Sequence, residues 1–358
     1  MDKYNIHART ISYSKNKAKQ RKFEEMHLQN DYDKATKMFE SDPSDLNKIC
    51  LNRKKRGKDR CFIENWRPIS LLNVDAKIMS KEIATRIKNV LPNINHHNIN
   101  GYVKDRYIGE TIRSIYDLMD FTGRENISGL LIFIDFQKVF DTLEWDFLFK
   151  CLQCFNLGQD FIHWVKVFYQ NIRSCLINNG TVSHFFNLER GVRQEDPLSP
   201  YLFILAVETL AISIRSNVLI KGITLGNEET TLLQYGNDTT AVLSETNSAQ
   251  AHFDSLDVFE YLSGLKVNGS KTEGLWIGSL KYDDIKSFGI KWPDEPRKAL
   301  GVFTYDQNLI YEKNFKDKLF KIKKLINISV VIQRSLPSWR HVWRGKELAL
   351  YNLSLIHI

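Results

Sequence analysis

Long hydrophobic runs are missing from this chain of 358 residues. The longest apolar stretch near the middle, "YLFILAV" at 201–207, is far too short to span a bilayer, which takes about 20 apolar residues. The N-terminal sequence, "MDKYNIHARTISYSKNKAKQ", contains no apolar core of the length that a signal peptide needs. We therefore expect an intracellular protein, nuclear or cytoplasmic, that is not secreted and has no membrane partner.

Cysteine is also scarce, with five in the whole chain, which suits a reducing compartment. Cys151 and Cys154 form a C-x-x-C, but neither a second pair at zinc-finger spacing nor an H-x₃₋₅-H follows them. Their surroundings, "FLFKCLQCFNLG", are typical of a helix, so buried thiols on one helix face explain the spacing better than a zinc site does. We assign no metal to them.

Internal repeats and low-complexity tracts are absent as well, and the composition is that of a globular protein, with 43% hydrophobic and 12% aromatic residues. The formal net charge of +8 favours a polyanionic partner. Six of the eight residues in "RKKRGKDR" (53–60) are basic. Such a run fits a solvated loop or a nuclear-import patch as well as it fits a phosphate contact.

Helix and strand patterns interleave after residue 60. "SGLLIFIDF" (128–136) is a short, continuous apolar run, typical of a strand buried on both faces, and Asp135 stands at its end. "LLQYGNDTTAVL" (232–243) has the outline of a hairpin with a tight turn before Asp238. Apolar spacing predicts helices at 74–91, 141–155 and 198–217.

Two carboxylates thus stand at strand ends. Asp135 could simply cap a helix or pair with a lysine, and Asp238 could belong to an ordinary turn, because Gly, Asn and Asp are the usual turn residues. On neighbouring strands, however, the two side chains would suit Mg²⁺, which takes one or two carboxylates and lets substrate phosphates fill its other positions. Two such ions can align an attacking 3′-hydroxyl and a leaving pyrophosphate. A basic protein with such a site is a candidate nucleotidyl transferase.

Seven sequence blocks decide between these interpretations. They are "NWRPISLLN" (65–73), "GYVKDRYIGE" (101–110), "FIDFQKVFDT" (133–142), "GVRQEDPLSPYLF" (191–203), "YGND" (235–238), "SGLKVNGSKTE" (263–273) and "LGV" (300–302). Together they closely resemble the reverse transcriptase domain of LINE-type, non-LTR retrotransposons, over roughly residues 55–325. Each block alone is weak evidence, but seven in the same order are not expected by chance.

The resemblance implies an α+β fold: a right-hand polymerase palm, made of an antiparallel sheet with helices on one face, with partial fingers and a partial helical thumb. Residues 1–50 would be a polar, helical connector, 51–290 the fingers and palm, and 291–358 a partial thumb and a degenerate C-terminal tail. The implied activity is RNA-directed DNA polymerisation with two Mg²⁺ ions, an RNA template, a DNA primer and deoxynucleoside triphosphates. Its protein partners are unknown.

Within this family, Asp135 and Asp238 match two of three metal-binding carboxylates, and Asn237 stands where the third is usual. Phe140 matches the aromatic gate that lies under the sugar and disfavours ribonucleotides, although simple core packing would also explain it. Gln194 matches a pocket residue that contacts the nucleotide and the template.

Three cations also match family positions. Arg106, with Lys104 beside it, matches the finger cations that contact the incoming triphosphate. Lys271 lies in the block that the family uses near the pyrophosphate, where it could assist proton transfer. For all three, an exposed and solvated charge is the plain alternative.

Several positions depart from the family pattern. The usual Y-A-D-D is "YGND" here, so that Asn237 replaces a principal metal ligand, and the usual R-Q-G-C-P-L-S-P is "RQEDPLSP". Glu195 thus replaces a Gly that lets backbone and nucleotide approach closely, and Asp196 would add a second negative charge beside the polyphosphate. Asp105 likewise stands where Gly is usual.

We therefore expect a truncated and partly degenerate copy, with polymerase activity at or near background because of Asn237 and Glu195. Two alternatives remain open. One is a non-catalytic nucleic-acid-binding remnant that keeps the basic cleft, and the other is a translation product with no selected role. Intact Asp135, Phe140 and Gln194 favour the polymerase.

Overall fold

The computed structural model describes most of the middle of the chain. The described residues are 47–54, 66–178, 181–278, 288–292, 298–300, 302–303, 316, 319–320 and 323. Most of the expected connector, the basic stretch beyond Lys54, and the expected thumb segment and tail therefore lie outside the described residues, apart from these few positions. The first described strand already begins at Asn47, inside the range expected for the connector.

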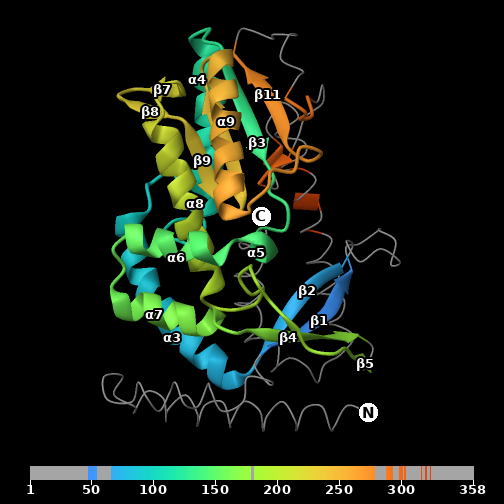
Figure 1. The fold of residues 1–358 in the computed structure, drawn as a ribbon. Helices are drawn as coiled ribbons and strands as arrows, with labels where there is room; N and C mark the ends of the chain where they lie inside the picture. The colour runs from blue at the N-terminus through green and yellow to red at the C-terminus, as the bar shows by residue number, and fades with distance from the viewer. Residues whose placement is uncertain are drawn as a thin grey trace, which may run out of the picture.

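A four-stranded antiparallel sheet, called here the central sheet, forms the upper half of the molecule (Figure 1). Its strands in spatial order are β11 (Glu273–Ile277), β3 (Gly129–Ile134), β10 (Asp238–Leu243) and β9 (Leu232–Tyr235). The hairpin expected at 232–243 is confirmed, because β9 and β10 pair on either side of the two-residue turn Gly236-Asn237. Gly236 has a φ of +63°, a conformation that this kind of hairpin turn favours and that Gly adopts without strain.

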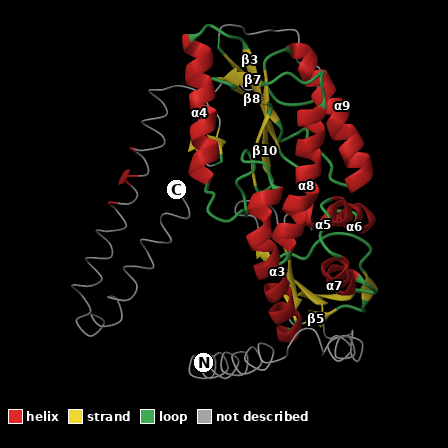
Figure 2. Cartoon of the chain, turned by 90° about the vertical axis from the view of Figure 1, so that its left-hand side faces the viewer, coloured by secondary structure: helices red, strands yellow, loops and turns green. Residues whose placement is uncertain are grey.

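Helices cover both faces of the central sheet. They are α4 (Ile108–Arg124), α8 (Ser199–Ser216) and α9 (Thr246–Ser263). Alternate residues of β3 enter two separate hydrophobic clusters: Leu130 and Ile132 join the one that contains α8 and α9, and Leu131 joins the one that contains α4. Figure 2 shows α4 on one side of the sheet and α8 and α9 on the other. Helices were expected on one face, but a strand that is apolar on both faces requires two covers.

The lower half contains a second sheet and the remaining helices (Figure 1). The strands are β1 (Asn47–Lys54), β2 (Trp66–Leu72), β4 (Arg173–Asn178), β5 (Thr181–Val182) and β6 (Phe186–Asn187), and the helices are α3 (Val74–Ile94), α5 (Val139–Thr142), α6 (Trp145–Cys154) and α7 (Gln159–Tyr169). Short pairs β7 (Ile223–Leu225) with β8 (Glu228–Thr230) and β12 (Lys298–Ala299) with β13 (Val302–Phe303) complete the described elements.

The expected helices are present with shifted ends. The first, α3, continues through Pro92 to Ile94. The second is divided into α5 and α6, and the third is α8. The expectation that both thiols of the C-x-x-C are buried is wrong for one of them, since Cys151 is buried and Cys154 is exposed on α6. Among the described residues, no helix is long and apolar enough to cross a membrane.

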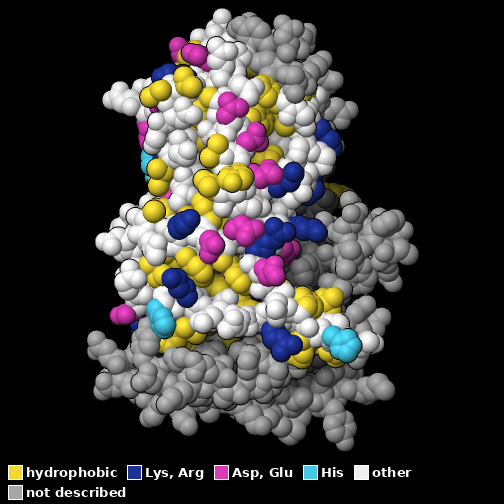
Figure 3. Space-filling model, viewed as in Figure 1, with side chains coloured by type: hydrophobic (Ala, Val, Ile, Leu, Met, Phe, Trp, Pro, Cys, Tyr) yellow, Lys and Arg dark blue, Asp and Glu magenta, His cyan; other side chains and the backbone are white. Residues whose placement is uncertain are grey.

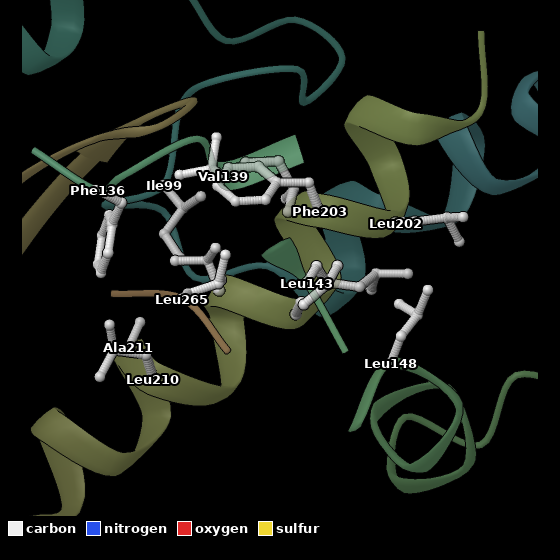
Figure 4. Close-up of a cluster of buried hydrophobic side chains, with 14 of the residues drawn as sticks. Ile99, Phe136, Val139, Leu143, Leu148, Leu202, Phe203, Leu210, Ala211 and Leu265 are labelled. Carbon is white, nitrogen blue, oxygen red and sulfur yellow. The ribbon is translucent and has the colours of Figure 1, made fainter. Parts of the chain in front are cut away.

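Helix α8 lies at the centre of the main hydrophobic core. It is apolar on nearly all sides, and a helix of that kind is stable only when other elements surround it. Figure 4 shows Phe203 and Leu210 of α8 among Phe136, Val139 and Leu265, which come from the segments that follow β3 and α9. The core thus fixes the residues just beyond the end of β3 in place. Together, the sheets and the packed helices confirm the expected α+β fold.

The outer edge of β9 is covered by the segment that follows α3. The backbone N–H of Asn100 donates to the carbonyl of Gln234 at 2.8 Å, and the N–H of Gln234 donates to the carbonyl of Asn98 at 2.9 Å. One residue further on, Gly101 lies directly against the backbone of Gly236. The turn between β9 and β10 is therefore held from outside by a backbone contact with no room for a side chain.

We expect Gly101→Ala to destabilise the fold, because the new Cβ would lie 1.9 Å from the backbone nitrogen of Gly236. Overpacking of this kind costs roughly 1–3 kcal/mol in the free energy of unfolding, which urea denaturation would measure. Gly123→Ala in α4 is the matched control, since no heavy atom lies within 4 Å of its added Cβ. It should leave stability unchanged or raise it by up to about 1 kcal/mol. Equal stability of the two variants would contradict the described contact.

Candidate active site

The two candidate metal-binding carboxylates face each other across adjacent strands. The antiparallel register of β3 and β10 pairs Ile134 with Thr239, so the next residues, Asp135 and Asp238, stand opposite each other where these strands end. Directly opposed residues have Cβ atoms about 4.5–5.5 Å apart. The expected arrangement of these two residues on neighbouring strands is confirmed.

Negative charge is concentrated at this point. Partial burial, and then the like charge of Asp135, raise the pKa of the Asp238 carboxyl above its ordinary value. Figure 3 shows acidic and basic side chains close to one another across the middle of the face in view. A cation placed between the two carboxylates would remove their mutual repulsion.

A loop after α9 supplies two partners for Asp135. The Oδ2 atom of Asp135 accepts hydrogen bonds from Lys271 Nζ and from Asn268 Nδ2, each at 3.1 Å. The backbone is tied in the same way, since the N–H of Asn268 donates to the carbonyl of Asp135 at 2.7 Å. Lys271 therefore lies against Asp135, and its expected place near a pyrophosphate stays a prediction. Asn268 was missed by the sequence analysis, although it lies three residues before Lys271 in the same block.

The donor set fits a metal only in part. Asn237 is half-buried in the turn next to Asp238 and offers a neutral amide where the family has a carboxylate. Among the described residues, no group of three His, Cys, Asp or Glu side chains is placed to hold a metal ion. Asp135 and Asp238 suit one oxygen-preferring cation such as Mg²⁺. The residues described here do not provide the carboxylates that two ions would share.

Phe140 and Gln194 lie in two segments that hydrogen bonds hold together. Phe140 belongs to α5, is half-buried, and has its ring centroid 5.4 Å from that of Phe203, so it takes part in core packing. Gln194 Nε2 donates to Asp141 Oδ1 at 3.0 Å. Burial raises the pKa of Asp141, and this hydrogen bond opposes that shift. Gln194 is thus held beside the residue that follows Phe140.

Arg106 is engaged away from the carboxylates. Its guanidinium donates to four main-chain carbonyls at the end of α3 and in the turn after it, those of Pro92, Asn95, His96 and Ile99, at 2.5–3.3 Å. Arg106 therefore anchors the segment that covers β9. A contact with a triphosphate would require it to release some of these bonds. Lys104, in the loop before it, is exposed.

Two departures from the family pattern occupy strained backbone positions. Asp105 has a φ of +62° and Glu195 a φ of +70°, which is the left-handed region that favours Gly. These are the positions where the family usually has Gly. Asp196 needs a correction, because it does not face a polyphosphate. It is 4% exposed and accepts hydrogen bonds from the hydroxyl groups of Ser80 and Ser199.

Opposed carboxylates at the ends of two central antiparallel strands are the arrangement of a polymerase palm. Comparison with known families agrees, because the model of the reverse transcriptase (RNA-dependent DNA polymerase) family matches residues 53–302. The 149 kDa protein of transposon TX1 from Xenopus laevis is 31% identical over 265 residues, which are 73% of this chain and 20% of that protein. The retrovirus-related Pol polyprotein of the type-2 retrotransposable element R2DM from Drosophila melanogaster is 25% identical over 58% of this chain and 19% of that protein.

The family model matches well over half of the residues of this chain, and the chain therefore belongs to the reverse transcriptase family. The resemblance to non-LTR retrotransposons is confirmed by the transposon relatives. The chain spans about a fifth of the length of these two relatives. A solved telomerase from Candida albicans, in complex with a TWJ fragment of telomeric RNA, is similar with a TM-score of 0.47 at 10% identity over 70% of this chain and 43% of that chain. The family assignment does not depend on that likeness.

We expect Glu195→Gly and Asp105→Gly each to stabilise the protein. A non-Gly residue in the left-handed region costs about 1–2 kcal/mol, and the greater freedom of Gly in the unfolded chain offsets about 0.4–1 kcal/mol of that. A net gain of about 0.5–1 kcal/mol per site in the free energy of unfolding should appear in urea denaturation. Glu189→Gly is the control, because Glu189 is also exposed and is not among the positive-φ residues. The free energy of unfolding of this control variant should fall by up to about 1 kcal/mol. If Glu189→Gly instead raised it as much as Glu195→Gly does, the gain at position 195 could not be attributed to relief of backbone strain.

Proposed function

We propose that this chain carries the palm of a non-LTR retrotransposon reverse transcriptase, whose substrates are an RNA template, a DNA primer and deoxynucleoside triphosphates, and that its activity in this copy is at or near background. The observation that supports the proposal best is the opposition of Asp135 and Asp238 in a chain of the reverse transcriptase family. In this proposal the two carboxylates hold a divalent cation, Mg²⁺ by preference. That cation would supply charge neutralisation at the triphosphate and activation of the primer hydroxyl.

The side chains around the carboxylates have proposed parts in binding. Phe140 would lie under the sugar and limit ribonucleotides, its half-buried ring held against Phe203. Gln194, fixed by Asp141, would contact the nucleotide and the template. Lys271, next to Asp135, would meet the pyrophosphate. Lys104 remains a proposed triphosphate contact, and Arg106 could join it only by leaving the carbonyls that it now binds.

Asn237 is the proposed reason for low activity. An amide keeps the shape of the carboxylate but removes one negative charge, and a neutral oxygen is a poorer ligand for Mg²⁺. Metal stabilisation of such transfers is worth several kcal/mol, so even a partial loss lowers the rate by orders of magnitude. Glu195 adds a long charged side chain at the position of a family Gly.

A non-catalytic nucleic-acid-binding remnant is the second candidate function. Asn237 favours it, and so does the ion pair between Lys271 and Asp135, which neutralises one carboxylate without a metal. The two functions differ in one observable, because restoring the carboxylate at position 237 should raise primer extension only in the polymerase.

Primer extension on an RNA template with Mg²⁺ or Mn²⁺ tests the proposed activity. The unaltered chain should extend at or near background. Asn237→Asp should raise extension, and Asn237→Asp with Glu195→Gly should exceed either single change, because the second charge conflict is then also removed. Asp135→Asn in the double variant is the control and should return it to background.

Two results would contradict this account. Robust Mg²⁺-dependent extension by the unaltered chain would mean that Asn237 serves as a ligand. No gain from the double change in a protein shown to be folded by circular dichroism would place the defect outside the carboxylate site.

Nucleic-acid binding should persist without catalysis. The net charge of +8 and the basic stretch 53–60 favour phosphate contacts, which release counterions from the nucleic acid. We therefore expect weak, sequence-independent binding to a primer-template, with affinity falling steeply between about 50 and 200 mM salt in fluorescence anisotropy. Replacing the six basic residues of 53–60 by Gln should flatten that dependence. An affinity indifferent to salt would rule out a charge-based contact surface.

A further inference from the structure

The ammonium group of Lys271 lies beside Asp135, one of the two carboxylates proposed to bind the metal ion. Its Nζ atom lies 3.1 Å from Asp135 Oδ2, and Asn268 Nδ2 donates to the same oxygen at 3.1 Å. Asp238 faces Asp135 from the adjacent strand. Two carboxylates with one ammonium leave a single net negative charge, so this lysine offsets half of the negative charge of the opposed pair.

This contact is placed so that it can open. The side chain of Lys271 is 58% exposed and that of Asp135 is 28% exposed, so the pair is not locked in the core. A lysine ammonium is a compact charge on a flexible stem, and it can leave one partner for water at little cost. Asn268, whose backbone is bonded to that of Asp135, would remain in place when the lysine moves.

We propose that Lys271 is a built-in counter-ion of Asp135 that competes with a divalent cation, so that the site alternates between a lysine-paired and a metal-bound state. The proposal rests on the metal site of the proposed function and adds a control on its occupancy. Asp135 Oδ2 already accepts two hydrogen bonds, from Lys271 and Asn268, so a divalent cation that binds this oxygen has to displace one of these donors. The amide at 237 weakens the metal-bound state and leaves the lysine-paired state unchanged.

Binding of Mn²⁺, followed by its electron paramagnetic resonance signal, tests the competition without any activity. Lys271→Met should bind Mn²⁺ about two- to fivefold more tightly than the unaltered chain, the range that loss of a partly exposed ion pair supports. Its melting temperature without metal should fall, because the two carboxylates then repel each other uncompensated, and Mn²⁺ should raise it by more than in the unaltered chain. Lys271→Gln should behave in the same way, and Lys271→Arg should stay close to the unaltered chain.

Lys266→Met is the matched control. Lys266 lies on the same loop, is 60% exposed, and pairs with Glu260 at 3.3 Å rather than with Asp135. This variant should leave the affinity for Mn²⁺ unchanged. An equal gain in affinity from Lys266→Met would show a general effect of net charge and would overturn the proposal.

Asn237→Asp separates this proposal from the proposed function. If Asn237→Asp binds Mn²⁺ more tightly but neither neutral variant of Lys271 does, the competition is overturned and the metal site stands. If none of these variants binds Mn²⁺, the metal site fails and the competition fails with it. Tighter binding by both neutral Lys271 variants, with Lys271→Arg and Lys266→Met unchanged, supports the proposal.

Discussion

The register between β3 and β10 is the constraint on which the site depends. A side chain on a strand points to the face opposite that of its neighbour, so a slip of one residue would turn either carboxylate away from the other. A slip would move Leu131 into the hydrophobic cluster that now holds Leu130 and Ile132 and exchange the side chains of two packed cores, whose different shapes oppose that exchange. Core packing several residues away thus decides whether Asp135 and Asp238 meet.

Much of the fold was readable from the sequence because its signals are local. The continuous apolar run of β3, the turn residues at 236–237 and the all-round apolar α8 each reflect a burial pattern that short stretches encode. The second cover of the central sheet was not foreseen, although α4 is amphipathic with Ile115 and Leu118 buried on one face, because that pattern does not tell which surface the helix covers. That α4 packs on the second face of the central sheet can be inferred only after the order of the strands is known.

The positions of Asp135 and Asp238 on adjacent strands were predictable, because each follows from a local strand or turn pattern. The site was not predictable where contacts join distant segments. Asp196 was expected to lie beside the polyphosphate, but it is buried and accepts a hydrogen bond from Ser80, 116 residues earlier in the chain. Asp105 and Glu195 stood out in the sequence because each replaces a Gly of the family pattern. Only the structure shows that both residues have a left-handed backbone conformation.

The segment 98–100 along β9 has a consequence beyond the site. An uncovered outer strand is a template for pairing with another chain, and proteins commonly block such edges to avoid aggregation. Here β9 is blocked by parallel pairing with that segment, and on the opposite edge the carbonyl of Lys291 accepts from Gly274 of β11 while its N–H donates to Thr272, just before that strand. Neither protection uses Asp135, Asn237 or Asp238. A lineage could therefore change those three residues without exposing a sheet edge, and selection against aggregation would not oppose the loss of a carboxylate.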